Sequence, residues 1–279
     1  MTETPAPLAL VTGASSGIGR AFAVRLAADG HDLILVGRRK ERLDALAASL
    51  SGAGAGAGAA AAGAGATVAV EVVVADLATD AGIDAVAQRC ADRPVTLLVN
   101  NAGVAHYMPL ADLPPEKARE LLGVKVVAPT MLIRAVLPGM LVRGAGTILN
   151  VAGMLAFSGP APAAPAPGQR AVYTASLAGT VTLSQTLHAE LKGTGVGVHV
   201  VCPGIVATEF HEVQGMDLSS VPRMSADDVV TAALAGIELG ETVIAPGVED
   251  ASLLGRVFGA DLAAFHGQSP QLASRYRRG

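Results

Sequence analysis

Apolar and polar residues follow two different periods along this chain, and the two periods alternate. Short runs rich in Val, Ile and Leu are typical of strands that are buried on both faces of a sheet. These runs predict strands at Leu8–Thr12, Leu33–Gly37, Val68–Val74, Thr96–Asn100, Thr147–Val151, Val196–Cys202 and Thr242–Ala245. Apolar residues between the runs recur at helical spacing. They predict helices at Gly17–Asp29, Lys40–Leu50, Thr79–Cys90, Pro114–Leu137, Tyr173–Lys192 and Ser225–Leu239.

Strands that alternate with helices are typical of a parallel sheet with right-handed crossover connections. We therefore expect an α/β fold, a doubly wound parallel seven-stranded sheet with helices on both faces. The length of 279 residues fits one domain over residues 1–279. Ligands of such sheets bind at the carboxyl ends of the strands, so the residues that follow each strand are the candidates for chemistry.

Three segments depart from this alternation. Residues 52–66 contain only Gly and Ala, which predicts a flexible loop without reactive side chains. Residues 158–169 are rich in Ala and Pro and lie between the fifth strand and the Tyr173 helix. This loop is either a lid over a substrate pocket or a second neutral expansion. The tail from residue 253 to 279 is expected to be only partly ordered.

Composition excludes several functional classes. The net charge of −4 leaves no basic face for nucleic acid, and the chain has no Trp and 3% aromatic residues. Its two cysteines, Cys90 and Cys202, form no CxxC motif, which favours a reducing cytoplasm and no metal site. The N-terminus lacks the pattern of a signal peptide. Uncharged runs at 45–70 and 144–169 are too rich in Gly, Ala or Pro to predict a membrane span.

Glycine-rich and asparagine-rich turns follow three of the predicted strands. The turn Thr12-Gly13-Ala14-Ser15-Ser16-Gly17-Ile18-Gly19 ends the first strand and opens a helix. In that context the backbone can approach a pyrophosphate and present helix N-terminal N–H groups to it. Asn100-Asn101-Ala102-Gly103 follows the fourth strand, and Pro203-Gly204 follows the sixth.

Together these motifs resemble the short-chain dehydrogenase/reductase family, from about residue 8 to residue 246. The resemblance implies a single-domain Rossmann-like fold, a nicotinamide cofactor and a homodimer or homotetramer built through the helices of Lys125 and Tyr173. It implies cofactor contacts from Gly13, Ser15, Ser16, Gly17, Ile18, Gly19, Asp76, Leu77, Asn101, Ala102, Gly103, Pro203, Gly204 and Thr208.

The charge after the second strand favours NADP(H). A site for NAD(H) places a carboxylate there to accept a hydrogen bond from the ribose 2′-hydroxyl. This chain instead has Gly37-Arg38-Arg39-Lys40. Guanidinium groups bind a 2′-phosphate, and Arg38 is the predicted contact. Arg20 in the first helix is a second candidate, and Arg39 and Lys40 can also be read as a solvated helix start.

The catalytic positions depart from the family pattern. Members of the family use an Asn, a Ser, a Tyr and a Lys four residues after the Tyr. The corresponding residues here are Lys125, Gly153, Tyr173 and Leu177. Of the four family residues only the tyrosine is retained, and an unperturbed tyrosine is a poor base at neutral pH.

Two readings of Lys125 stay open. Its ammonium either replaces the missing lysine and acts beside Tyr173, or extends to solvent and leaves the site inactive. Further candidates for acid–base chemistry are His106, Tyr107, His211 and Glu212. Ser158 is a candidate for the missing hydroxyl, and Ser176, beside the place of the missing lysine, is expected only to cap the helix or face solvent.

Three functions follow from this combination. The first is an NADP(H)-dependent carbonyl or alcohol oxidoreductase with a rearranged catalytic site formed by Tyr173 and Lys125. The second is a non-redox enzyme, such as a cyclase, isomerase or lyase, in the same pocket. The third is an inactive protein that binds NADP(H). A small, apolar substrate is expected for the enzyme, and neither nucleic acid nor a membrane as a partner.

Overall fold

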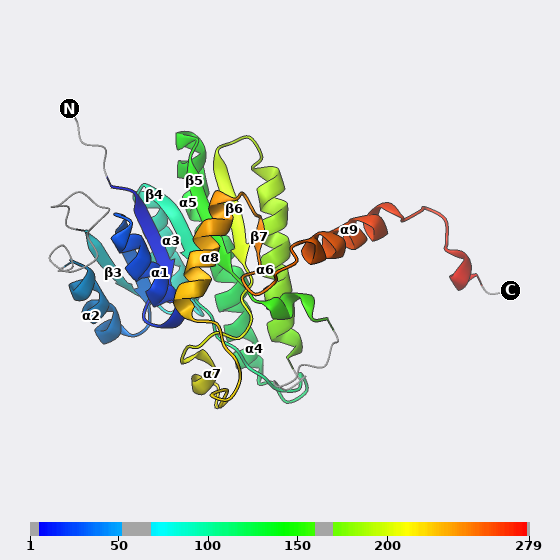
Figure 1. Cartoon of the computed structure of the whole chain (residues 1–279), viewed down its shortest axis with the longest axis horizontal. Helices are drawn as coiled ribbons and strands as arrows, with labels where there is room; N and C mark the ends of the chain where they lie inside the picture. Colours follow the sequence, from blue (N-terminus) through cyan, green and yellow to red (C-terminus); the bar gives the residue numbers. More distant parts are fainter. Residues whose placement is uncertain (1–5, 52–67, 160–169, 278–279) are drawn as a thin grey trace. The chain divides into compact units, whose positions relative to one another are not determined.

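The computed structural model describes residues 6–51, 68–159 and 170–277. The chain divides into two compact units, Met1–Pro246 and Gly247–Gly279. A seven-stranded parallel sheet forms the first unit, in the order β3-β2-β1-β4-β5-β6-β7 (Figure 1). The strands are β1 (Leu8–Thr12), β2 (Asp32–Gly37), β3 (Val70–Val74), β4 (Val95–Asn100), β5 (Gly146–Val151), β6 (Val196–Val201) and β7 (Val243–Ile244). The predicted fold class is confirmed.

Helices cover both faces of this sheet. The helices of the first unit are α1 (Gly17–Ala28), α2 (Lys40–Ser51), α3 (Asp80–Asp92), α4 (Pro115–Leu122), α5 (Ala128–Arg143), α6 (Ala171–Glu190), α8 (Ala226–Glu238) and the short α7 (Phe210–Val213), which lies beyond the ends of the strands (Figure 1). Alternate strand residues point to opposite faces. Ala9 and Val11 of β1 therefore pack in the cluster of α1, α2 and α8. Leu8 and Leu10 pack in the cluster of α3, α5 and α6.

The helix predicted at Pro114–Leu137 is longer than expected and is divided. It consists of α4, a π-helical turn η2 (Gly123–Val127) and α5. Pro138 lies within α5, and the helix ends only at Gly144, which adopts φ = 63°. Residues Pro115–Arg143 are long and apolar enough to cross a membrane, with a mean hydropathy of 1.6. Leu132 and Ile133 of this segment are instead buried against the sheet, as in the core helix of a globular protein.

Several elements were not predicted. A 3-10 turn η3 (Met154–Phe157) follows β5, and the short helix α7 follows β6. In the second unit, the segment expected to be a loose tail contains α9 (Ser252–His266) and the 3-10 turn η4 (Ser274–Tyr276). The predicted Gly/Ala loop at 52–66 lies outside the described residues, and so does most of the predicted loop at 158–169.

Candidate active site

A cavity of about 1080 Å³ lies where the carboxyl ends of the strands meet. Because β1 and β4 are neighbours and the chain winds outward from them in both directions, this is the crevice expected for a ligand. The predicted site residues share this location, with one exception. Residues lining the cavity include Gly13, Ser15, Ser16, Gly17, Ile18, Arg38, Asp76, Leu77, Asn101, Ala102, Gly103, Lys125, Tyr173, Pro203, Gly204 and Thr208.

Gly19 is the exception, and its role is to allow close packing. A Cβ atom there would overlap the carbonyl oxygen of Gly13 and the amide of Asn101. The Asn101 side chain donates to the carbonyl oxygen of Thr12 at 2.9 Å. The Thr12 hydroxyl accepts from the backbone N–H groups of Asn101 and Ala102, at 2.9 and 3.0 Å. The asparagine turn therefore fixes the glycine turn from the neighbouring strand.

The glycine turn has the form of a phosphate cradle. Gly13 and Gly17 adopt φ = 66° and 53°, which side chains rarely adopt. Ser16 is the N-cap residue of α1, but its side chain accepts no hydrogen bond from the helix. The N–H groups of the first turn are therefore not capped by Ser16 and can bind a ligand. The absence of side chains at the two glycines leaves space for a ligand's phosphates against the helix N-terminus. This arrangement fits a dinucleotide.

Arg38 lies at the edge of the cavity in a cluster centred on Glu120. Its Nη1 is 3.6 Å from the Glu120 carboxylate, which also contacts His106 at 3.1 Å and Lys117 at 3.0 Å. Burial opposes ionisation of Glu120, but the hydrogen bonds from Lys117 and His106 outweigh it and lower the pKa of that carboxyl. His106 is thus one partner of a charged cluster, and Arg20 is exposed on α1.

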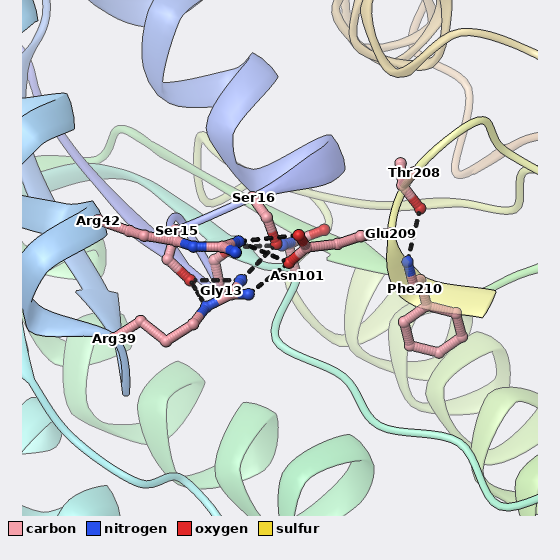
Figure 2. A network of polar contacts seen from close by, with 9 residues as sticks. All are labelled: Gly13, Ser15, Ser16, Arg39, Arg42, Asn101, Thr208, Glu209 and Phe210. Atoms are coloured by element: carbon pink, nitrogen blue, oxygen red, sulfur yellow. Dashed lines mark hydrogen bonds and ion pairs between the residues drawn. The ribbon is translucent and has the colours of Figure 1, made fainter. Parts of the chain in front are cut away.

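Arg39, the next residue, reaches the glycine turn itself. Its guanidinium donates to the hydroxyls of Ser15, at 2.9 and 3.1 Å, and Ser16, at 2.6 Å. It also pairs with Glu209, which lies beyond β6 (Figure 2). Arg42 holds both carboxylate oxygens of Glu209, at 2.9 and 2.8 Å. Arg39 is therefore not simply a solvated residue at the start of a helix, because its guanidinium contacts the glycine turn.

Lys125 lies in the π-helical turn and is buried, with 6% of its surface exposed. Its Nζ donates to the carbonyl oxygen of Val151 at 3.4 Å. The side chain passes close over Gly103, where a Cβ would lie 2.7 Å from the Lys125 Cε, so a larger residue there would shift the end of the lysine. Burial lowers the pKa of the amine to about 8. The side chain thus borders the cavity and does not extend to solvent.

Tyr173, in the first turn of α6, faces a second tyrosine. The ring centroids of Tyr173 and Tyr107 are 5.4 Å apart, edge to face at 68°. Burial, and then the charge and hydrogen bond of Tyr107, raise the pKa of Tyr173 well above 10. Burial also raises the pKa of Tyr107, while Tyr173 and the nearby Arg170 lower it. Both side chains are therefore neutral phenols at neutral pH.

Positions 153 and 177, where the resemblance predicts a serine and a lysine, are open and apolar, respectively. Leu177 is 1% exposed and packs with Tyr173 in one apolar cluster. A Cβ at Gly153 would lie 3.6 Å from both Leu177 and the Pro203 carbonyl oxygen, so the position has room but no hydroxyl. The Ser176 hydroxyl donates to the Tyr173 carbonyl oxygen at 2.7 Å within the helix and is buried.

The outer part of the cavity is mostly apolar. Its walls include Met154, Leu155, Phe210, Met216 and Leu218. Polar side chains that line the cavity beside them include Ser158, Arg170, Gln214 and His211, whose pKa is lowered by burial and then by Arg223. The Ser158 hydroxyl accepts from the Arg170 guanidinium at 3.2 Å. An apolar wall with few polar groups suits an organic substrate of low charge.

Sequence reasoning did not single out Arg42, Glu209 or Arg170, and it named Arg39 and Tyr107 as candidates without predicting their contacts with Glu209 and Tyr173. Arg39, Arg42 and Glu209 form an ion-pair cluster that only the fold brings together. The signals were weak: Arg42 lies one helical turn beyond Arg39, and Glu209 follows Thr208. Tyr107 was one candidate among several for acid–base chemistry, and nothing in the sequence predicts its contact with Tyr173. Arg170 stands next to a Pro-rich loop and had no motif to mark it.

Both the sequence and the fold of this chain match known proteins. A family model described as short chain dehydrogenase matches residues 7–218. An uncharacterized oxidoreductase of Staphylococcus epidermidis is 29% identical over 234 residues, which cover 83% of this chain and 91% of that protein.

Two solved structures resemble this fold along nearly the whole chain. A short-chain dehydrogenase from Sphingobium yanoikuyae, in complex with NADPH, has a TM-score of 0.87 at 35% identity. That likeness covers 97% of this chain and 100% of the other. The bulky-bulky ketone specific alcohol dehydrogenase from Comamonas testosteroni has a TM-score of 0.83 at 28% identity, covering 99% of this chain and 100% of the other.

Proposed function

This chain belongs to the short-chain dehydrogenase family, and from that premise we propose that it is an NADP(H)-dependent oxidoreductase that interconverts a ketone and an alcohol. One observation carries the proposal: a single cavity joins the glycine-turn cradle to the buried phenol of Tyr173. A binding site for a nicotinamide cofactor and a proton donor therefore share one space.

The cradle fits the phosphorylated cofactor. Gly13, Gly17 and the N-terminus of α1 would hold the pyrophosphate, and Arg38 and Arg39 supply positive charge where a 2′-phosphate is expected. The relative from Sphingobium yanoikuyae in complex with NADPH supports this choice. When bound, the cofactor would supply or accept the hydride.

Tyr173 would move the proton at the substrate oxygen. A phenol with a raised pKa holds its proton at neutral pH, so it is suited to donate a hydrogen bond and then a proton to a carbonyl oxygen that gains negative charge. The resting enzyme therefore carries the protonated phenol that a ketone substrate requires. Tyr107 would supply the second hydroxyl that Gly153 cannot, because its side chain is hydrogen-bonded to that of Tyr173.

Lys125 would act on the cofactor side of the cavity. Its amine borders Gly103 and the carbonyl oxygen of Val151, whereas the neighbouring group that shifts the pKa of Tyr173 is Tyr107. With a pKa of about 8, the amine is mostly protonated at neutral pH and can donate to the hydroxyls of a bound ribose. We therefore assign the relocated cation a binding role.

A redox-neutral reaction is the second candidate. Gly153 and Leu177 replace the serine and the lysine of the family pattern, and loss of both is the observation in its favour. A redox-neutral enzyme would use Tyr173 as an acid in the same apolar pocket and would convert substrate without a change in the nicotinamide.

The first experiment is calorimetric titration with NADPH and NADH, followed by a panel of bulky apolar ketones with NADPH. We expect NADPH to bind more tightly and its absorbance to fall with at least one ketone. In the Tyr173→Phe variant, binding should persist and turnover should be lost. Tight binding with product formation at constant absorbance would favour the redox-neutral enzyme. No binding of either cofactor would overturn the proposal.

A further inference from the structure

Three charged side chains connect the glycine turn to the segment after β6. Arg39 and Arg42 come from the start of α2, and Glu209 comes from the segment that carries α7. Figure 2 shows Arg39 and Arg42 converging on Glu209 beside Ser15 and Ser16. These contacts join residues about 170 positions apart in the sequence.

The cluster has a surplus of positive charge. Two guanidiniums share one carboxylate, which leaves a formal charge of about +1. Hydrogen bonds from Arg42 and then from Arg39 lower the pKa of Glu209 to about 2, so it is an anion at every physiological pH. A carboxylate held by two arginines presents the same planar pattern of acceptors that a phosphate offers to guanidinium groups.

Two members of the cluster, Arg39 and Glu209, line the cavity, and Arg42 holds Glu209 from behind. Ser15, Ser16 and Thr208 also line the cavity, next to the N-terminus of α1. Arg39 donates to both serine hydroxyls at the same place, so the polar groups of the cradle are already engaged with one another. A ligand phosphate that enters must replace part of this network.

We propose that Glu209 is an internal anionic ligand of Arg39 and Arg42 that the 2′-phosphate of the cofactor displaces, which makes Glu209 a determinant of cofactor selectivity. The inference rests on the proposed cofactor. A phosphate dianion carries more charge than a carboxylate and also binds arginine in a bidentate manner, so it competes well. A ribose hydroxyl is neutral and leaves Glu209 in place.

The ion pairs are exposed enough to exchange. The side chains of Glu209, Arg39 and Arg42 are 31%, 40% and 51% exposed. Partly exposed pairs of this kind contribute little net stability, because solvent screens them and ordering two long side chains opposes them. Displacing the carboxylate therefore costs little binding free energy, but the cost is large enough to appear as a change in the Kd of the ligand.

Displacement of Glu209 from the arginines would also free the segment that carries Phe210 and His211 to move. Glu209 precedes α7, and its carbonyl oxygen accepts from the Val213 N–H at 2.9 Å. Thr208 packs on the glycine turn, since a Cβ at Gly17 would lie 3.1 Å from its methyl group. Phe210 and His211 of the same segment line the cavity. The 2′-phosphate is thereby coupled to the position of this wall.

The test uses two soluble probes, 2′,5′-ADP, which carries the 2′-phosphate, and ADP, which lacks it. Calorimetry compares the native protein with Glu209→Gln and with Glu212→Gln, an exposed residue of α7 with the same change in charge. We expect Glu209→Gln to bind 2′,5′-ADP about five-fold more tightly and ADP within about two-fold of the native protein. Glu212→Gln should bind both probes as the native protein does.

Hydrogen exchange of the amides from Val213 to Met216 gives a second readout. In the native protein 2′,5′-ADP should speed their exchange and ADP should not, and in Glu209→Gln exchange should be fast without ligand. Equal or weaker binding of 2′,5′-ADP by Glu209→Gln, or slower exchange in the native protein, would overturn the role of Glu209 while leaving the cofactor assignment intact. Failure of both probes to bind any of the three proteins would overturn both.

Discussion

Tyr173 and Tyr107 present two neutral phenols to the same end of the cavity, with their ring centroids 5.4 Å apart. Burial raises the pKa of each group, and the pair is hydrogen-bonded. Under the proposed function, Tyr173 would give its proton to the substrate oxygen, and Tyr107 would donate a hydrogen bond to the same oxygen. In that function, Tyr107 would thus supply the hydroxyl that Gly153 does not.

Replacement of Tyr107 with Phe tests the pairing directly. The change removes one hydroxyl and keeps the ring, so the edge-to-face contact with Tyr173 should persist. We expect kcat for ketone reduction to fall about 10- to 100-fold, because one hydrogen bond to the reacting oxygen is lost. The Kd for NADPH, measured by calorimetry, should change less than about two-fold.

The third tyrosine provides the matched control. Tyr276 is 61% exposed and lies in the second unit, so Tyr276→Phe should leave kcat unchanged. A Tyr107→Phe enzyme with native kcat would show that the second phenol is only a packing neighbour. A parallel loss of cofactor affinity would point to a structural fault instead.

At the scale of elements, the π-helical turn is what brings Lys125 into the cavity. The Ala128 N–H bonds back to the Gly123 carbonyl oxygen, and the Lys125 carbonyl oxygen accepts from the Thr180 hydroxyl at 3.2 Å. The extra residue of a π-turn rotates the preceding side chains relative to α5. A buried amine is held in place by this turn at a cost in stability.

That cost predicts a pH-dependent stability. The pKa of Lys125 falls from 10.5 to about 8 on folding, so the unfolded chain binds more protons between these values. Stability due to this group therefore rises as the pH increases from 8 to 10.5. Replacement of Lys125 with Met should stabilise the protein more at pH ~7 than at pH ~9.5, by about 2 kcal/mol. Urea unfolding at the two pH values measures the difference.

The same change at Lys192, an exposed lysine after α6, should give a difference near zero. Equal effects of Lys125→Met at both pH values would show that the amine is not buried as a titrating group in the folded protein.

Sequence patterns predicted the strands closely but did not predict the π-helical turn, helix α7 or the end of α5. Buried strands show uninterrupted Val, Ile and Leu runs, so β1 at Leu8–Thr12 was predicted to the residue. The π-turn leaves no such mark, because Gly123–Val127 fits an ordinary helical period. Helix α7 has only four residues, too few for any period. The predicted helix end at Leu137 was too early, because Pro138 lies on the exposed side of α5 and the helix continues past it to Arg143.

At the scale of the molecule, sheet topology explains why so much of the cavity followed from the sequence. In a doubly wound sheet, every residue after a strand comes to one edge, so Gly13, Asp76, Asn101 and Pro203 meet whatever lies between them. The contacts of Glu209 with Arg39 depend on side-chain directions in two loops, which no strand pattern specifies. Motifs at strand ends were predictable, and contacts between loops were not.

The outer face of α5 leads to a prediction about assembly. Val127, the last residue of η2, and Leu141 of α5 are 44% and 41% exposed and lie about four helical turns apart. Exposed apolar residues repeated along a helix are typical of an interface between identical subunits. We expect a homodimer or homotetramer, and we expect Val127→Glu combined with Leu141→Glu to reduce the mass in solution to the monomer value of 27.8 kDa.

Sedimentation at several concentrations would measure that mass. Both positions are exposed in the single chain, so the double variant should keep its helical circular dichroism and its unfolding midpoint as a monomer. Leu239→Glu, at a 76% exposed leucine after α8, introduces the same kind of charge and should leave the assembly intact. A native protein that sediments at 27.8 kDa at all concentrations would contradict the prediction, and so would a double variant that stays assembled. Because α5 follows the π-turn directly, a monomeric variant would also reveal whether subunit contact helps to hold Lys125 in the cavity.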